Sequence, residues 1–160
     1  KASNSELSIE FEKISNRNLS RVLQLINKTN QFNLTGNRYT QTSLISLLNK
    51  CQISLVGNVK DEFANYGLTV IILAKVDTTT VNVQEFVMSC RVFGRGVEVR
   101  TIEEVINRCS MDKKAIKKVK FAARKTDKNR AILEFLNSII GKGEHCLKHL
   151  GVKFRVKDNN

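Results

Sequence analysis

The chain has 160 residues, with 27 lysines and arginines against 15 aspartates and glutamates, and a formal net charge of +12. This length corresponds to one domain with a substantial hydrophobic core. No apolar run is long enough to cross a bilayer and nothing resembles a signal peptide, so we expect a cytoplasmic protein that does not bind a membrane.

The cysteine and histidine content argues against a metal centre. The four cysteines are widely spaced and form no Cys-x-x-Cys pair of the kind that zinc sites and redox couples use. The only histidines are His145 and His149. We therefore expect no metal, and reduced thiols at Cys51, Cys90, Cys109 and Cys146.

The first fifty residues predict one strand and two helices. Residues 7–14 alternate apolar and polar side chains, as a half-buried strand does. Asn18 is a residue type that caps helices, and the apolar side chains after it predict a helix over 19–28. A polar loop separates this helix from a second one, which we expect to begin at Thr42 or Ser43.

Three strands follow in the middle of the chain. We expect the first over 53–59, a turn at Asn65-Tyr66-Gly67 and the second strand over 68–76. Asp77-Thr78 predicts a short reversal into the third strand, over 80–89.

The rest of the chain predicts a helix, a strand, a helix and a strand, over 97–109, 118–123, 128–140 and 152–156. Asp127 is the expected cap of the second of these helices, which stops at Gly141. The complete order is β-α-α-β-β-β-α-β-α-β. It indicates a single α+β domain over 1–160, with a mixed central sheet flanked by helices.

The turn between the strand 80–89 and the helix after it has the spacing Arg-x-x-Gly-x-Gly, from Arg91, Gly94 and Gly96. Glycine permits the positive φ that lets backbone N–H groups converge, and a helix start adds further unpaired N–H groups. Such a turn suits a phosphate. The alternative is a tight turn whose glycines serve packing alone.

Positive charge is concentrated late in the chain. Between residues 113 and 130 one acid, Asp127, accompanies nine cations: Lys113, Lys114, Lys117, Lys118, Lys120, Arg124, Lys125, Lys128 and Arg130. Such a surface attracts polyanions, or is simply a solvated face. Because aromatic residues are not interleaved with these cations, a nucleic-acid partner is the less favoured interpretation.

The element order and the Arg-x-x-Gly-x-Gly turn resemble the GNAT acyltransferase fold. Longer strings are similar to the C-terminal domain of FkbH-like proteins. They are Asn27-Lys28-Thr29-Asn30-Gln31-Phe32-Asn33-Leu34-Thr35, Arg38-Tyr39-Thr40, Met88-Ser89-Cys90-Arg91-Val92-Phe93-Gly94-Arg95-Gly96-Val97-Glu98 and Thr126-x-x-Asn129. Together they touch almost the whole chain.

The resemblance implies a function within a larger enzyme. FkbH-like proteins join a HAD-type phosphatase domain to a GNAT-like domain, and load glycerate as a thioester onto an acyl carrier protein. The Asp-x-Asp motif of the HAD domain is absent here. The resemblance therefore implies a C-terminal domain excised from a longer chain, with the HAD-type domain and an acidic carrier protein as partners.

The resemblance also assigns a cofactor site. In GNAT proteins the Arg-x-x-Gly-x-Gly loop binds the pyrophosphate of coenzyme A, and the pantetheine arm lies between two splayed strands. Coenzyme A or the phosphopantetheine of a carrier is thus the expected cofactor. The residues that match are Arg91, Val92, Gly94, Arg95 and Gly96 in the loop, and Asn129 near the arm.

Cys90 is the candidate nucleophile. It follows the strand, beside Arg91 and close to a helix start, and both neighbours favour the reactive thiolate. The resemblance implies that this thiol holds the glyceryl group as a thioester before the carrier takes it. The alternative is an inert core cysteine.

The polar loop over 29–40 is the candidate acyl-binding segment, because amides and hydroxyls can hydrogen-bond a small hydroxylated group. Its candidate residues are Asn30, Gln31, Asn33, Thr35 and Arg38. Hydrogen bonding within the loop itself is the alternative.

Two departures from the family patterns bear on the function. Where the FkbH-like pattern has a second carboxylate, this chain has Asn65, and where many GNAT enzymes place a tyrosine acid it has Phe135-Leu136. Thiols need little protonation as leaving groups, so thioester exchange suffers less than acetyl transfer to an amine. An acyltransferase-type domain, a silent docking module for the carrier, and a nucleic-acid binder or N-acetyltransferase remain as hypotheses, in that order.

Overall fold

A computed structural model of the chain describes residues 6–141 and 153–156. Its elements are β1 (Ser8–Lys13), α1 (Leu19–Lys28), α2 (Gln41–Leu48), β2 (Ile53–Lys60), β3 (Asn65–Asp77), β4 (Thr80–Met88), α3 (Val97–Met111), β5 (Lys118–Phe121), α4 (Arg130–Gly141) and β6 (Lys153–Val156). This is the order predicted from the sequence. Cys146, His145 and His149 lie outside the described residues.

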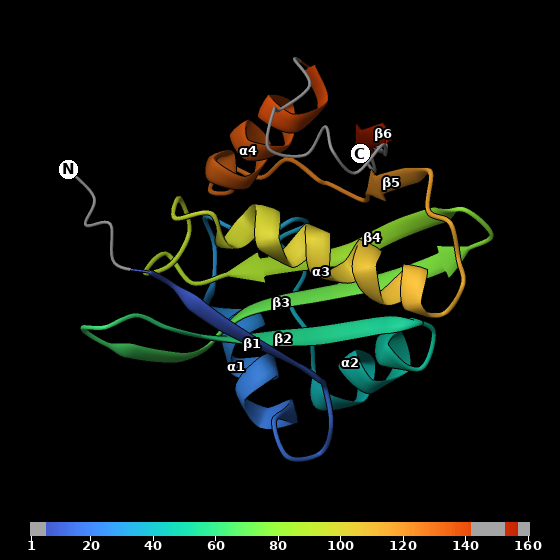
Figure 1. The fold of residues 1–160 in the computed structure, drawn as a ribbon. Coiled ribbons are helices and arrows are strands. Elements are labelled where there is room, and N and C mark those ends of the chain that lie inside the picture. Colours follow the sequence, from blue (N-terminus) through green and yellow to red (C-terminus); the bar gives the residue numbers. More distant parts are fainter. Residues whose placement is uncertain (1–5, 142–152, 157–160) are drawn as a thin grey trace.

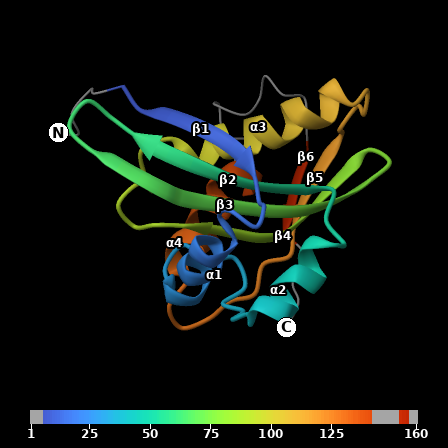
Figure 2. The same cartoon turned by 90° about the horizontal axis from the view of Figure 1, so that it is seen from below.

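One six-stranded sheet organises the domain, with the strands in the spatial order β1-β2-β3-β4-β5-β6. The first four strands pair antiparallel, whereas β4 with β5 and β5 with β6 pair parallel. The mixed α+β sheet expected from the sequence is therefore confirmed. Helix α3 crosses one face of the sheet, and α1 and α2 cover the other (Figures 1 and 2).

The sheet is buried on both faces. Residues of β3 from Leu68 to Ala74 are all buried, because one set of side chains packs towards α3 and α4 and the other towards α1 and α2. A strand covered on both sides reads as a continuous apolar run rather than as an alternating one. This explains the most hydrophobic stretch of the sequence.

The helix caps differ in part from the prediction. Thr40 forms a capping box with Ser43, so α2 begins at Gln41. Asn18 occupies the N-cap position of α1, but its side chain accepts from the Ser15 N–H and donates to Glu12 and Lys13 instead. The prediction that Asp127 caps α4 is wrong, because α4 begins at Arg130 rather than at Lys128 and the residue before it is Asn129.

The turn predicted at Asn65-Tyr66-Gly67 lies earlier in the chain. Asp61 accepts from the N–H groups of Phe63 and Ala64 and closes the β2–β3 turn there, because a carboxylate can imitate a backbone turn. Residues 65–67 already belong to β3. The predicted reversal at 77–78 is confirmed by the short β3–β4 hairpin, in which Thr78 has φ 46°.

Candidate functional site

Strands β4 and β5 pair over only half of β4. Thr80–Val83 align with Lys118–Phe121, and the second half of β4 has no strand beside it on that edge. Residues 32–34, from the loop after α1, occupy this place. Leu34 N–H donates to the Phe86 carbonyl and Met88 N–H donates to the Phe32 carbonyl, both at 3.0 Å.

The segment 32–34 is held from its other side as well. Arg124 N–H donates to the Leu34 carbonyl at 3.0 Å, and the Arg124 guanidinium donates to the Thr35 carbonyl at 2.9 Å. The chain between β5 and α4 therefore lies along the edge of this segment that faces away from β4. Residues 32–34 pair with β4 through one isolated antiparallel bridge, between Asn33 and Val87, and lie between β4 and the chain that follows β5. We call these three residues the internal strand.

The side chain of Phe32 packs into the hydrophobic core between β4 and α4. It is 1% exposed and meets Phe86 edge-on, with ring centroids 5.3 Å apart. The ring centroids of Phe93 and Phe135 each lie 6.0 Å from that of Phe32. Phe93 belongs to the Arg-x-x-Gly-x-Gly turn, residues 91–96, which we call the glycine loop, and Phe135 belongs to α4. The four rings form one apolar cluster joining β4, the glycine loop and α4.

Buried amides fix the internal strand in place. Asn129 is fully buried, and its amide group donates to the carbonyls of Asn33 and Arg124 at 3.0 and 2.8 Å. The Asn33 side chain accepts from the N–H groups of Thr35 and Gly36 and donates to the Thr29 carbonyl. Asn33 and Asn129, predicted to contact substrate and cofactor, thus bond to the chain itself.

Glu85 is a buried carboxylate that the sequence analysis did not select. It is fully buried in β4 and accepts hydrogen bonds from the hydroxyls of Thr35 and Tyr39 and from the amide of Asn37. Burial raises the pKa of Glu85, while these three donors oppose the rise. Burial and the nearby Glu85 carboxylate also raise the pKa of Tyr39. The cluster ties the loop after α1 to β4.

The alternation of inward- and outward-facing residues in β4 is interrupted next to Glu85. Val81, Val83, Phe86 and Met88 belong to the core beneath α3, so the inward phase shifts by one residue between Val83 and Phe86. The pairing of β3 with β4 is irregular at the same point. The shift places Glu85 against the loop that joins α1 and α2, and it was the available signal in the sequence.

The glycine loop has the predicted backbone, with φ 83° at Gly94 and 86° at Gly96. Its early N–H groups, however, already have acceptors. Those of Arg91, Val92 and Phe93 donate to Ser89, and that of Gly94 donates to the Glu98 carboxylate at 2.9 Å. Val92 is fully buried in the core, and burial raises the pKa of Glu98.

The loop arginines face the β2–β3 turn. Arg95 pairs with Asp61 at 3.0 Å, and both Arg91 and Arg95 lie over the Tyr66 ring, 5.7 and 5.9 Å from its centroid. Burial raises the pKa of Asp61, but the hydrogen bonds from Arg95, Phe63, Ala64 and Tyr66 outweigh it and hold that pKa below its usual range. Arg91 is exposed, whereas Arg95 is committed to the ion pair.

Cys90 is exposed at the end of β4 and opens into a pocket of about 380 Å³. On one side the pocket is bounded by α1 and the loop after it, and on the other by the end of β4. Its other lining residues are Arg21, Leu25, Lys28, Thr29, Asn30, Gln31, Phe32, Met88 and Ser89. Of the five predicted acyl-binding residues, Asn30 and Gln31 line it. Arg38 instead donates to the carbonyls of Ile26 and Thr29 and caps the end of α1.

No protein-family model and no curated protein sequence matches the chain. Solved structures do. The chain has the GNAT acetyltransferase fold.

The similar structures are distant in sequence. The ribosomal-protein-S18-alanine N-acetyltransferase of Escherichia coli has a TM-score of 0.58 at 10% identity, over 82% of this chain and 76% of that one. Ard1 of Thermoplasma volcanium scores 0.59 at 16% identity, over 79% and 78%. A GNAT-family acetyltransferase of Streptococcus pneumoniae scores 0.52 at 18% identity, over 88% and 93%. At these identities the likeness establishes the fold alone.

A coenzyme A molecule accompanies one similar structure, the NatC complex bound to Gag peptide and CoA, with a TM-score of 0.50 at 13% identity, over 66% of this chain and 69% of that one. The GNAT mode of holding this group does not fit the present chain as folded. The internal strand 32–34 occupies the edge of β4 beyond its pairing with β5, and the loop N–H groups from Arg91 to Gly94 are bonded internally. No chemical step is therefore assigned to coenzyme A.

The first part of the basic segment 113–130, around Lys117, lies far from Cys90. Lys117 N–H bonds to Thr79 at the start of β4, and nine strand residues at about 3.3 Å each separate that end from Cys90, a distance of roughly 30 Å. Arg130 pairs with Glu134 of its own helix. The cations close to Cys90 are Arg21 and Lys28 in its pocket and the adjacent Arg91.

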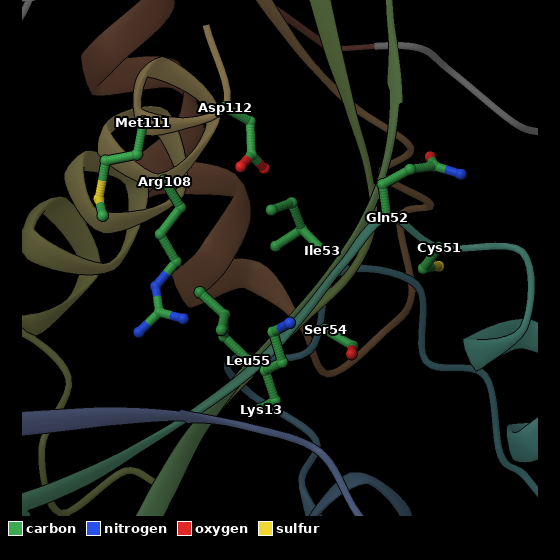
Figure 3. Close-up of a pocket in the computed structure, with 9 residues that line it drawn as sticks. All are labelled: Lys13, Cys51, Gln52, Ile53, Ser54, Leu55, Arg108, Met111 and Asp112. Carbon is green, nitrogen blue, oxygen red and sulfur yellow. The ribbon is translucent and has the colours of Figure 1, made fainter. Parts of the chain in front are cut away.

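A second pocket, of about 420 Å³, lies between the start of β2 and the end of α3 (Figure 3). Ile53 and Leu55 point towards α3, whereas Cys51 and Gln52 point away from it (Figure 3). Arg108 is paired with Glu104 at 2.7 Å. The Cys51 thiol points away from α3 and the Arg108 guanidinium is paired. This pocket therefore offers no thiol placed as the Cys90 thiol is in the pocket beside α1.

Two further observations concern metals and membranes. Residues 6–141 and 153–156 contain no group of three or more His, Cys, Asp and Glu side chains that could hold a metal ion. Among the helices in those ranges, none has the length and apolar character that a bilayer span requires.

Proposed function

We propose that this domain transfers an acyl group through a thioester on Cys90 to the phosphopantetheine thiol of an acyl carrier protein. The observation that carries the proposal is the pocket in which the exposed Cys90 thiol lies with Asn30, Gln31, Arg21 and Lys28. The amides can hydrogen-bond a small hydroxylated acyl group, and the two cations can attract an anionic donor. We choose a glyceryl unit because strings of this sequence resemble FkbH-like proteins, a resemblance that no family model or curated sequence match accompanies.

The reaction has two steps. The Cys90 sulfur attacks the carbonyl of an acyl phosphate, a C–S bond forms, the C–O bond to phosphate breaks, and the thiol proton leaves with phosphate or water. The carrier thiol then attacks the Cys90 thioester. A new C–S bond forms on the carrier, the Cys90 C–S bond breaks, and the carrier's thiol proton replaces the acyl group on Cys90.

N-acetyl transfer from coenzyme A is the less supported alternative. Phe135 stands where many GNAT enzymes have a tyrosine acid, and its ring packs against Phe32 rather than lining an open channel. The internal strand 32–34 also uses the edge of β4. Transfer between thiols needs neither a strong general acid nor that edge.

Acylation of the chain tests the proposal. Mass spectrometry after incubation with a glyceryl phosphate anhydride, such as a bisphosphoglycerate, should find one glyceryl group on Cys90, removable by a holo-carrier protein. The dephosphorylating HAD-type domain must be supplied alongside. Cys90→Ser should abolish the adduct and Cys51→Ser should keep it. An adduct that persists in Cys90→Ser, or none on the wild type, contradicts the proposal.

Thiol reactivity gives a separate readout. Burial raises the pKa of the Cys51 and Cys109 thiols, whereas Cys90 is exposed. Iodoacetamide should therefore label Cys90 at least about tenfold faster than the other two in the folded domain. Equal rates would remove the case for Cys90 as the nucleophile.

A further inference from the structure

We infer that a pantetheine arm does not lie between β4 and β5 in this domain, and that its thiol reaches Cys90 through the pocket beside α1. The inference rests on the proposed function only for the choice of ligand. Residues 32–34 fill the gap between β4 and β5, and a separate pocket beside α1 is open to Cys90.

Residues 32–34 close the gap between β4 and β5, because they hydrogen-bond to β4 on one side and to Arg124, after β5, on the other. Displacing residues 32–34 would break the bonds from Leu34 to Phe86 and from Met88 to Phe32, together with the Arg124 bond to Leu34. Phe32 and Leu34, 1% and 0% exposed, would both enter water. A pantetheine arm could replace some of these hydrogen bonds, but not the packing of a phenyl ring against three others.

The hydrogen bonds of Asn33 and Asn129 add to the free-energy cost of opening the gap. The Asn129 amide group donates to Asn33 and Arg124 and its oxygen accepts from Thr126. Withdrawing residues 32–34 would break the bond from Asn129 to the Asn33 carbonyl, whereas the bonds of Asn129 with Arg124 and Thr126 would remain. One buried amide hydrogen would lose its acceptor, and such a loss is costly.

The pocket beside α1 offers the open route to the same thiol. It has the volume of an ordinary ligand pocket, and Cys90 lies exposed at one end of it. A phosphopantetheine arm carries two amide groups and a phosphate. The Gln31 amide and the NH2 group of Asn30, whose oxygen already accepts from Arg38, can bond such amides. Arg21 and Lys28 suit the phosphate.

Amide hydrogen exchange tests the filled gap. The Leu34 and Met88 amides should exchange slowly, and saturating coenzyme A or pantetheine should change neither rate by more than about twofold. Unchanged exchange rates at both amides support the inference, whether the ligand binds elsewhere or does not bind. A ligand-induced change of about tenfold or more at both amides overturns it.

Disulfide exchange with pantethine, the disulfide of pantetheine, tests the route. The Cys90 thiolate attacks one sulfur, a Cys90–pantetheine disulfide forms, the pantethine S–S bond breaks, and one pantetheine thiol is released with the proton from Cys90. Gln31→Trp, at an exposed pocket residue, should slow this reaction about tenfold. Gln41→Trp, an exposed glutamine of α2 outside the pocket, is the matched control and should react within about twofold of wild type.

A second pocket variant, Lys28→Trp, should slow the reaction as Gln31→Trp does, and it supplies the result if Gln31→Trp does not fold. Circular dichroism measures whether each variant is folded. Unchanged rates in the two folded pocket variants, or no reaction of wild-type Cys90, overturn the route. Both readouts are independent of acyl chemistry. If Cys90 forms the disulfide through the pocket but never an acyl adduct, the proposed function fails while this inference stands.

Discussion

At the residue scale, the hydrogen bonds of Glu85 link its protonation to the stability of the whole domain. Burial raises its pKa in the folded protein above the ordinary value of a glutamate. The native state therefore holds this proton more tightly than the unfolded chain does. The contribution of Glu85 to stability is fully present below its ordinary pKa and is lost as the pH rises through the folded pKa.

Glu85→Gln isolates this effect because an amide oxygen can still accept from Thr35 and Tyr39. The free energy of unfolding of the wild type, measured by urea denaturation, should fall relative to that of Glu85→Gln between about pH 4 and about pH 8. Glu62→Gln, at an exposed carboxylate in the β2–β3 turn, is the matched control for the loss of one negative charge. A constant wild-type to Glu85→Gln difference across that range would contradict the assignment.

The sequence could not predict the roles of side chains that can hydrogen-bond either to a ligand or to the protein backbone. Asn33, Thr35 and Asn129 have side chains suited to either a ligand or the backbone, and composition does not distinguish the two. The pairing of Arg95 with Asp61 joins positions 34 residues apart, without a local signal. By contrast, the positive φ at Gly94 and Gly96 follows from the spacing alone and is confirmed.

At the scale of elements, the prediction succeeded where periodicity or capping decided the structure. Helix α1 covers the predicted 19–28, and the three middle strands are confirmed with small changes at their ends. The loop after α1 was correctly placed in sequence but not recognised as a sheet component. An isolated strand of three residues lies below the length at which alternation can be detected.

The internal strand makes a quantitative prediction about stability. Phe32→Ala removes the ring that joins β4, the glycine loop and α4, so it should cost about 3–5 kcal/mol in the free energy of unfolding. Phe63→Ala, at a ring that is 73% exposed, should change it by less than about 0.5 kcal/mol. Urea denaturation measures both. Phe32→Leu, expected to lose less, supplies the value if the alanine variant does not fold, and equal losses at Phe32 and Phe63 would contradict the buried cluster.

At the scale of the whole molecule, the charge is divided between two ends of β4. The exposed lysines around Lys114 lie near its start, and Arg21, Lys28 and Arg91 lie near its end, beside Cys90. Charge steers association most strongly where it surrounds the site of contact, and salt screens this effect. An acidic carrier bound for Cys90 should therefore respond to the second group.

Charge reversal at single lysines tests this division. Lys28→Glu should slow acyl transfer to the carrier about tenfold at low salt, and the deficit should shrink at high salt because the pair interactions are screened. Lys114→Glu, an exposed lysine at the far end, should transfer at a rate close to wild type. A larger effect from Lys114→Glu would relocate the docking surface to the basic segment 113–130.

The way residues 32–34 are enclosed has a consequence for the order of folding. Their partners lie far along the chain, since Asn129 bonds to Asn33 across 96 positions and Arg124 to Thr35 across 89. Contacts of such high contact order form slowly, because long loops must close before the contacts are made. During synthesis, the loop after α1 cannot reach its final position until residue 129 has left the ribosome, so the sheet can be completed only after most of the domain has been translated.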